Sequence, residues 1–146
     1  MPRIVICSSV TFYPELPDLA RSFAALGLEV TIPKLARKFT TELSNEERDA
    51  LLNTESVSPA AKRGFIEDYL KEISAGDVVL AYNRPKHQIP GYIGPNVLME
   101  LTVGFYLKKQ LFVWEAVDAR VHGAEELQAI GVISLNQDPQ NILKYL

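Results

Sequence analysis

Glu100 is the residue of this sequence best placed to do chemistry, because it stands alone among apolar neighbours. The run from Val97 to Leu107 is otherwise apolar almost throughout, and burying an unpaired carboxylate is costly. Two interpretations are open. In one, Glu100 pairs with a nearby Lys, Arg or Tyr, or points out at a helix edge. In the other, it faces a pocket, where it acts as a nucleophile or binds sugar hydroxyls.

The pocket interpretation of Glu100 follows from the elements around it. The β-branched run Val78 to Ala81 predicts a buried strand, and a polar loop with Gly and Pro follows from Asn83 to Gly94. A helix begins at Pro95, where a proline suits the first helical position. Open α/β sheets bind ligands at the carboxyl ends of their strands, and this helix begins there.

A second polar turn follows the first predicted strand, Arg3 to Ser9. The strand ends in Ser8 and Ser9, and Thr11, Phe12 and Tyr13 extend the turn. Small hydroxyl residues here are typical of a ligand-binding βα turn, although a serine pair is also an ordinary helix cap. Both interpretations remain open.

The remaining pattern alternates strands and helices. Further strands are predicted at Leu28–Pro33, Asp77–Asn83, Gln110–Trp114 and Val132–Leu135. Helices are predicted at 16–26, at 45–52, from Pro59, from Pro95, at 125–130 and from about Pro139. This alternation predicts an α/β fold, a three-layer α/β/α sandwich around a five-stranded, mostly parallel sheet. The flavodoxin-like order 2-1-3-4-5 brings the Ser8–Tyr13 turn beside the loop and helix that lead to Glu100.

The segment Lys34 to Ser58 carries charges of both signs and is predicted to be a solvated surface element. Within it, Ser44 and Glu47 have the spacing of a capping box. The alternative is a mobile lid, in which Arg37 or Lys38 meets an anionic ligand.

Composition sets the broad class. The chain has 146 residues, 47% of them hydrophobic and 23% charged, with a formal net charge of −3. We expect a single domain, 1–146, in the cytoplasm, with no nucleic acid or membrane partner. The one cysteine, Cys7, is expected to be buried and structural. Because the two histidines are isolated and no P-loop or GxGxxG occurs, we expect no metal and no cofactor.

Three short stretches together resemble a known family. They are DVVLA from Asp77, GYIGPN from Gly91 and MEL around Glu100. This pattern resembles the nucleoside 2-deoxyribosyltransferase-like proteins, in particular the uncharacterised branch with a YIGxN-x-x-x-E segment. The resemblance implies that Glu100 is a nucleophile that attacks the anomeric carbon of a nucleoside or nucleoside monophosphate, breaking or transferring its N-glycosidic bond.

The resemblance also implies a set of substrate-binding residues and one departure. The set comprises Ser8, Ser9, Tyr13, Asn83, Tyr92, Gly94 and Asn96. Catalytic relatives carry an Asp eight residues before the strand Asp, to protonate the leaving base. Here that position is Tyr69, and Asp68 is about 100° away around a helix. Two functions therefore stay open: a glycosidic-bond enzyme, and a non-catalytic nucleotide- or nucleoside-binding module of the same fold.

The helix that carries Glu100 predicts self-association. It is apolar nearly all round, with Phe105, Tyr106 and Leu107 beyond what one sheet face needs. Members of the family also complete their sites with a neighbour's residues. We expect a homodimer or a higher homo-oligomer.

Overall fold

Two neighbouring parallel strands, β1 (Arg3–Ser8) and β3 (Val78–Tyr82), form the centre of the fold. The computed structural model describes residues 1–53 and 58–146. β1 and β3 pair from Ile4↔Val78 to Ser8↔Tyr82, so their polar carboxyl ends lie next to each other. Both strands are almost entirely buried, as expected for a parallel sheet covered on both faces.

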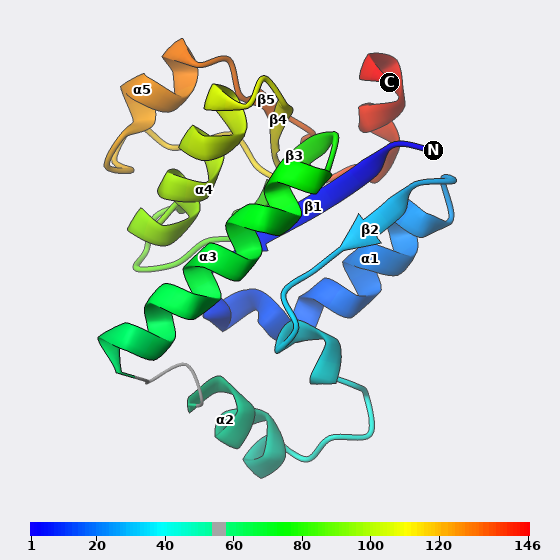
Figure 1. Cartoon of the computed structure of the whole chain (residues 1–146), viewed down its shortest axis with the longest axis vertical. Coiled ribbons are helices and arrows are strands. Elements are labelled where there is room, and N and C mark those ends of the chain that lie inside the picture. Colours follow the sequence, from blue (N-terminus) through cyan, green and yellow to red (C-terminus); the bar gives the residue numbers. More distant parts are fainter. Residues whose placement is uncertain (54–57) are drawn as a thin grey trace.

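The sheet has five strands in the order β2-β1-β3-β4-β5, and every pairing is parallel (Figure 1). The other three strands are β2 (Glu29–Thr31), β4 (Gln110–Val113) and β5 (Ile133–Ser134). The predicted α/β class and the flavodoxin-like order are confirmed. The sheet, predicted to be mostly parallel, is parallel throughout its described strands.

Helices cover both faces of this sheet. Helices α3 (Pro59–Ala75), α4 (Pro95–Tyr106) and α5 (Ala124–Ala129) lie on one face (Figure 1). Helix α1 (Leu16–Ala24) and the 3₁₀ helix η3 (Pro139–Tyr145) lie on the other. Alternation along β1 explains the two cores: Ile4 and Ile6 pack toward α1, while Val5 and Cys7 pack toward α3 and α4.

Several helices begin where the sequence predicts. Ser44 and Glu47 form the capping box of α2 (Asn45–Asn53), each backbone N–H donating to the other's side chain at 3.1 Å. The Ser58 hydroxyl accepts from the Ala61 N–H at the start of α3, 3.2 Å away. The predicted surface element 34–58 is therefore described except for residues 54–57, which lie outside the described residues.

Two segments differ from the predictions. The turn after β1 is a 3₁₀ helix, η1 (Val10–Glu15), and the last helix is also 3₁₀. Pro14 inside η1 has no N–H to donate, and Phe12 N–H bonds to the Ser9 carbonyl three residues back. The strands are also shorter than predicted. Asp77, for example, precedes β3, and its carboxylate accepts from the Arg3 backbone N–H at 2.8 Å.

The loop before α4 is anchored by Asn83. Its buried amide donates to the carbonyls of Gly91 (3.1 Å) and Glu115 (2.8 Å) and accepts from the Glu115 N–H (2.9 Å). Gly91 has φ +58°, and a Cβ there would lie 2.2 Å from the Ala116 carbonyl oxygen. Only glycine fits so close an approach. These contacts tie the loop to the end of β4 and so set where α4 begins.

Within the described residues, no helix combines the length and apolarity needed to cross a bilayer. The same part of the chain contains no cluster of three His, Cys, Asp or Glu side chains that would hold a metal ion.

Candidate active site beside Glu100

A cavity of about 700 Å³ lies beside Glu100, within the range of small-molecule sites. Its wall comes from the carboxyl end of β1, from η1, from the segment after β2, and from α3 and α4. This is the switch point between β1 and β3, where open α/β sheets bind ligands. The lining residues are Ser8, Tyr13, Ile32, Pro33, Lys34, Leu35, Arg37, Lys38, Lys62, Phe65, Ile66, Asp68, Tyr69, Lys71, Glu72, Asn96 and Glu100.

Glu100 lines this cavity from the second turn of α4 and is only 7% exposed. Burial raises the pKa of its carboxyl from 4.5 to about 7, and a hydrogen bond from the Cys7 thiol offsets part of that rise. No described residue forms an ion pair with it. Of the two interpretations of Glu100, the structure therefore favours the one in which it faces a pocket.

Cys7 is fully buried on β1, as predicted, and its thiol also forms a hydrogen bond with Glu100. Burial raises the pKa of its thiol well above the ordinary value, and the nearby Glu100 carboxylate raises it further. The thiol is therefore protonated at neutral pH, and its S–H is available as a weak donor to Glu100.

The cavity brings together four of the eight residues that the sequence nominated. Ser8, Tyr13 and Asn96 line it with Glu100. Asn96 lies four residues before Glu100, on the same face of α4. The Ser8 hydroxyl donates to the Tyr82 carbonyl at 3.1 Å, which joins the ends of β1 and β3.

The other four nominated residues do not line the cavity. The hydrogen bonds of Asn83 hold the loop, and the Ser9 hydroxyl accepts from Lys86 Nζ at 2.8 Å. Gly94 is the residue before α4, and a Cβ there would lie 3.3 Å from the Tyr92 ring. Tyr92 in turn stacks edge-on against His87, with 5.2 Å between ring centroids. These residues shape the loop that leads into α4.

Tyr69, at the position where the resemblance places a catalytic acid, is in the cavity wall. Its hydroxyl donates to the Ile6 backbone carbonyl. Burial raises the pKa of Tyr69 well above the ordinary value, and electrostatic interactions with Cys7 and Glu100 raise it further. A phenol held in this way is a very weak acid at neutral pH.

Sequence reasoning missed the second carboxylate in the wall. Asp68 and Glu72 both line the cavity from α3. They are four residues apart and therefore share one helix face, which is the signal that would have found Glu72. A carboxyl group across the cavity from a nucleophile is the usual partner in glycosidic chemistry.

The cavity has a cationic rim, of which sequence reasoning named Arg37 and Lys38 and missed the three other lysines. Lys34, Arg37, Lys38, Lys62 and Lys71 line it, and none of them forms an ion pair with another described residue. Five cations face three carboxylates, so the rim attracts an anionic ligand even though the whole chain carries a net charge of −3.

No protein-family model matches the chain, and no curated protein matches it in sequence. Its fold is similar to that of a solved structure, the CMP N-glycosidase BcmB of Clostridium botulinum. The TM-score is 0.52 and the identity 14%, over 97% of this chain and 94% of that chain. The similarity establishes a common α/β fold over nearly the whole of both chains.

The raised pKa of Glu100 predicts a stability that depends on pH. The folded-state pKa lies above the unfolded value, so the proton stabilises the fold, and stability is lost as pH rises from about 4.5 to about 7. In Glu100→Gln this loss is absent. Between pH 4.5 and pH 8, the unfolding free energy of Glu100→Gln relative to that of wild type should therefore increase by about 3 kcal/mol.

Urea unfolding of both proteins at several pH values measures this difference. Glu126→Gln, which removes an exposed carboxylate on α5, is the matched control and should show no comparable gain. A difference between Glu100→Gln and wild type that does not change with pH would show that the Glu100 carboxylate is ionised at no cost.

Proposed function

We propose that this protein breaks the N-glycosidic bond of a nucleoside monophosphate, with Glu100 as the nucleophile. The observation that carries the proposal is a buried carboxylate, not ion-paired with any described residue, beside a nucleotide-sized cavity at the switch point of the sheet. Two further lines support it. A CMP N-glycosidase has a similar fold, and the YIGPN…E segment resembles the nucleoside 2-deoxyribosyltransferase-like family.

The proposed reaction has two steps. A Glu100 carboxylate oxygen attacks C1′ of the sugar, and the C1′–N bond breaks with its electron pair leaving on the base nitrogen. A carboxylic acid in the wall protonates that nitrogen. Water then attacks C1′, displaces Glu100 and gives its proton back to the wall carboxylate. A second nucleobase in place of water gives transfer instead of hydrolysis.

Asp68 and Glu72 are the groups that we propose as the proton donor. Tyr69 is unsuited to this role because its hydroxyl is engaged with the Ile6 carbonyl and its pKa is raised. Both carboxyl groups line the cavity from α3, the helix that also carries Tyr69. The donor has therefore moved along α3 relative to the pattern of the resembled family.

The second candidate function is a non-catalytic nucleotide- or nucleoside-binding module. Tyr69 is the observation that favours it, because an unreactive phenol stands where the resembled enzymes carry an acid. Such a module would keep the cavity, the cationic rim and ligand affinity without turnover.

We expect the protein to act in the cytoplasm without a cofactor. Cytoplasmic thiols remain reduced, which suits the unpaired thiol of Cys7. The proposed nucleophile and acid are both side chains, so the reaction requires no added group.

We assign the cationic rim to the 5′-phosphate of the substrate. Arg37 and Lys38 are exposed residues of η2 (Ala36–Lys38), while Lys62 and Lys71 reach the cavity from α3. Cations from both sides suit a dianionic phosphate better than a neutral nucleoside. The substrate class is therefore a nucleotide.

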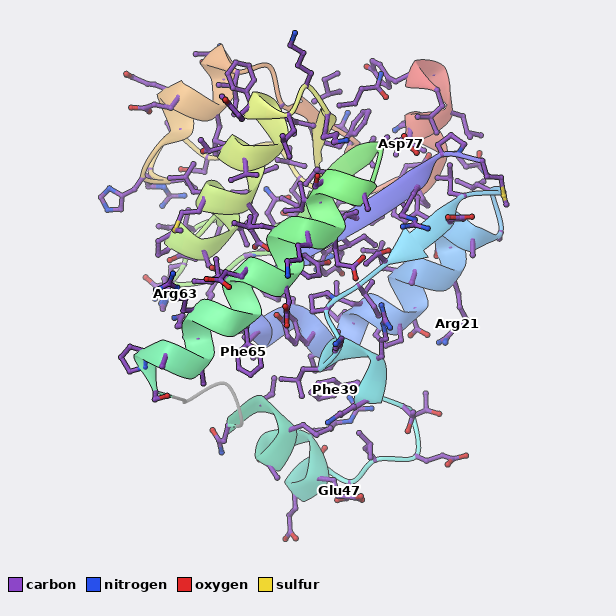
Figure 2. All side chains as sticks on the ribbon, viewed as in Figure 1. Arg21, Phe39, Glu47, Arg63, Phe65 and Asp77 are labelled. Atoms are coloured by element: carbon purple, nitrogen blue, oxygen red, sulfur yellow. The ribbon has the colours of Figure 1, made fainter. Side chains whose placement is uncertain are left out.

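We also propose that two copies of the chain associate through α4. Met99, Phe105 and Tyr106 are 52%, 50% and 82% exposed on α4, and Met99 and Tyr106, seven residues apart, lie on one side of that helix. Phe65, labelled on α3 in Figure 2, is 52% exposed and also lines the Glu100 cavity. Because α3 packs against α4, a second copy seated on this surface buries these side chains and closes the cavity from outside.

The first functional prediction concerns release of free base from a panel of nucleoside monophosphates, measured by chromatography. Wild type should release base from at least one of them. Glu100→Gln should lose activity on the order of 10³-fold or more, as expected when a nucleophile is removed. Because Glu100 must be ionised to attack while the wall carboxyl group must carry a proton, kcat/KM should pass through a maximum with pH, its rise reporting the ionisation of Glu100.

Glu42→Gln, which changes an exposed glutamate that does not line the cavity, is the control and should keep full activity. Asp68→Asn and Glu72→Gln identify the proton donor by which of them slows base release. Substantial turnover by Glu100→Gln would refute the nucleophile. Saturable binding of a monophosphate without turnover would establish the binding module instead.

The second functional prediction separates the phosphate from the nucleoside. In Arg37→Gln/Lys38→Gln, the Kd for the preferred monophosphate should rise about fivefold, the effect of losing roughly 1 kcal/mol from exposed charge pairs. The Kd for the parent nucleoside should not change. Lys108→Gln/Lys144→Gln removes the same charge from outside the cavity and should leave both Kd values unchanged. Equal losses for nucleoside and monophosphate would contradict the assignment.

The third functional prediction concerns assembly, measured by sedimentation velocity at micromolar concentration. Wild type should sediment as a dimer or larger. Met99→Glu/Tyr106→Glu should be a monomer, because a buried unpaired carboxylate opposes association. Leu143→Glu/Leu146→Glu places the same charges on exposed apolar residues at the C-terminus and should remain associated. A wild-type monomer under these conditions would be inconsistent with the proposal.

A further inference from the structure

A second cavity, of about 620 Å³, lies on the α1 side of the sheet near the ends of β3 and β4. Arg21 and Phe39, both labelled in Figure 2, reach it from α1 and from the segment after η2. Tyr82 and Trp114 contribute from the ends of β3 and β4, and Arg48 from α2. Its size is that of a nucleotide site, and the proposed reaction uses none of these residues.

Two short segments form walls of both cavities. In η1, Tyr13 lines the Glu100 cavity, and the next two residues, Pro14 and Glu15, line the second one. Farther along, Arg37 and Lys38 line the first cavity, whereas residues 39–41 line the second. A ligand in the second cavity therefore contacts the segments that also shape the first.

Two neighbouring aromatic side chains, Tyr82 and Trp114, line the second cavity. The rings of Tyr82 and Trp114 lie 5.6 Å apart, centroid to centroid. Trp114 is 8% exposed, and its Nε1–H has no hydrogen-bond partner among the described residues. Aromatic surfaces of this kind suit a planar base.

Opposite charges at the same cavity provide further recognition. The Glu15 carboxylate accepts from the Tyr82 hydroxyl at 2.8 Å and has capacity for a second donor, such as a base amino group. Arg48 donates to the Thr40 carbonyl at 3.1 Å and forms no ion pair with a described residue, whereas Arg21 is paired with Asp18. Arg48 is therefore the cation available to a phosphate.

We propose that this second cavity is a binding site for a nucleoside monophosphate with an amino-bearing base. The base packs against Tyr82 and Trp114, its amino group donates to Glu15, and its phosphate binds Arg48. The site is separate from the Glu100 cavity, so it does not depend on whether that cavity is catalytic. Through η1 and residues 37–41, occupancy of one cavity alters the walls of the other.

Trp114 makes the proposal directly testable, because it is the only tryptophan in the sequence and it lines this cavity. Its fluorescence should change saturably when CMP or AMP is added to the full chain. In Arg48→Gln the apparent Kd should rise at least fivefold. Arg63→Gln, which removes an exposed α3 arginine outside both cavities, should leave it unchanged.

Two substitutions of opposite charge at one rim residue, Thr41, test the site without replacing Arg48, whose loss could affect folding. Thr41 is exposed and lines the second cavity. Thr41→Glu should weaken nucleotide binding by repelling the phosphate, and Thr41→Lys should retain or strengthen it. Calorimetry should show two CMP or AMP sites per wild-type chain, and Arg48→Gln should weaken only one of them.

Three results would overturn the second site. The first is the absence of a saturable fluorescence change with millimolar CMP or AMP. The second is a change that Arg37→Gln/Lys38→Gln abolishes and Arg48→Gln leaves intact, because the signal would then come from the Glu100 cavity. The third is an equal response to inorganic phosphate alone, which would show that no base is recognised.

Discussion

The burial of one carboxylate is the constraint on which the rest of this structure depends. Glu100 is held on an apolar helix against β1, and its desolvation raises the pKa of its carboxyl from 4.5 to about 7. No described cation compensates it, and the Cys7 thiol is a weak donor. The fold therefore accepts a local cost at neutral pH that the packing of α4 must offset through Val97, Leu101 and Gly104.

The surrounding polar groups hold that arrangement in place. Ser8 bonds the end of β1 to the end of β3, and Asn83 bonds the end of β3 to the end of β4. Because Asn83 also holds Gly91, the loop cannot shift without breaking buried hydrogen bonds. The start of α4, and with it the position of Glu100, is thereby set relative to three strands. Asn83, which the resemblance nominated as a ligand contact, therefore supports the loop instead of lining the cavity.

Local signals in the sequence were sufficient for the elements and their order. The Ser44–Glu47 capping box, the Ser58–Pro59 start and the Pro95 start are decided by neighbouring residues, and all three are as predicted. The sheet order followed from alternation and the usual crossover rules. Contacts between distant segments were not readable. Nothing local indicates that Asn83 bonds Glu115, that Phe65 lies half exposed at a cavity, or that Lys38 and Lys71 face the same ligand space.

The raised pKa of Glu100 is compatible with the nucleophilic role proposed for it. A carboxyl with a pKa near 7 is commonly the acid of a glycosidic pair, while the nucleophile stays ionised. Here, however, Glu72 is in the more exposed wall of α3, and Glu100 is in the buried one. A positive charge that develops at C1′ beside Glu100 favours its ionised form. In the proposed reaction, the carboxylate that burial destabilises would therefore gain most from the transition state, which is the differential binding that lowers a barrier.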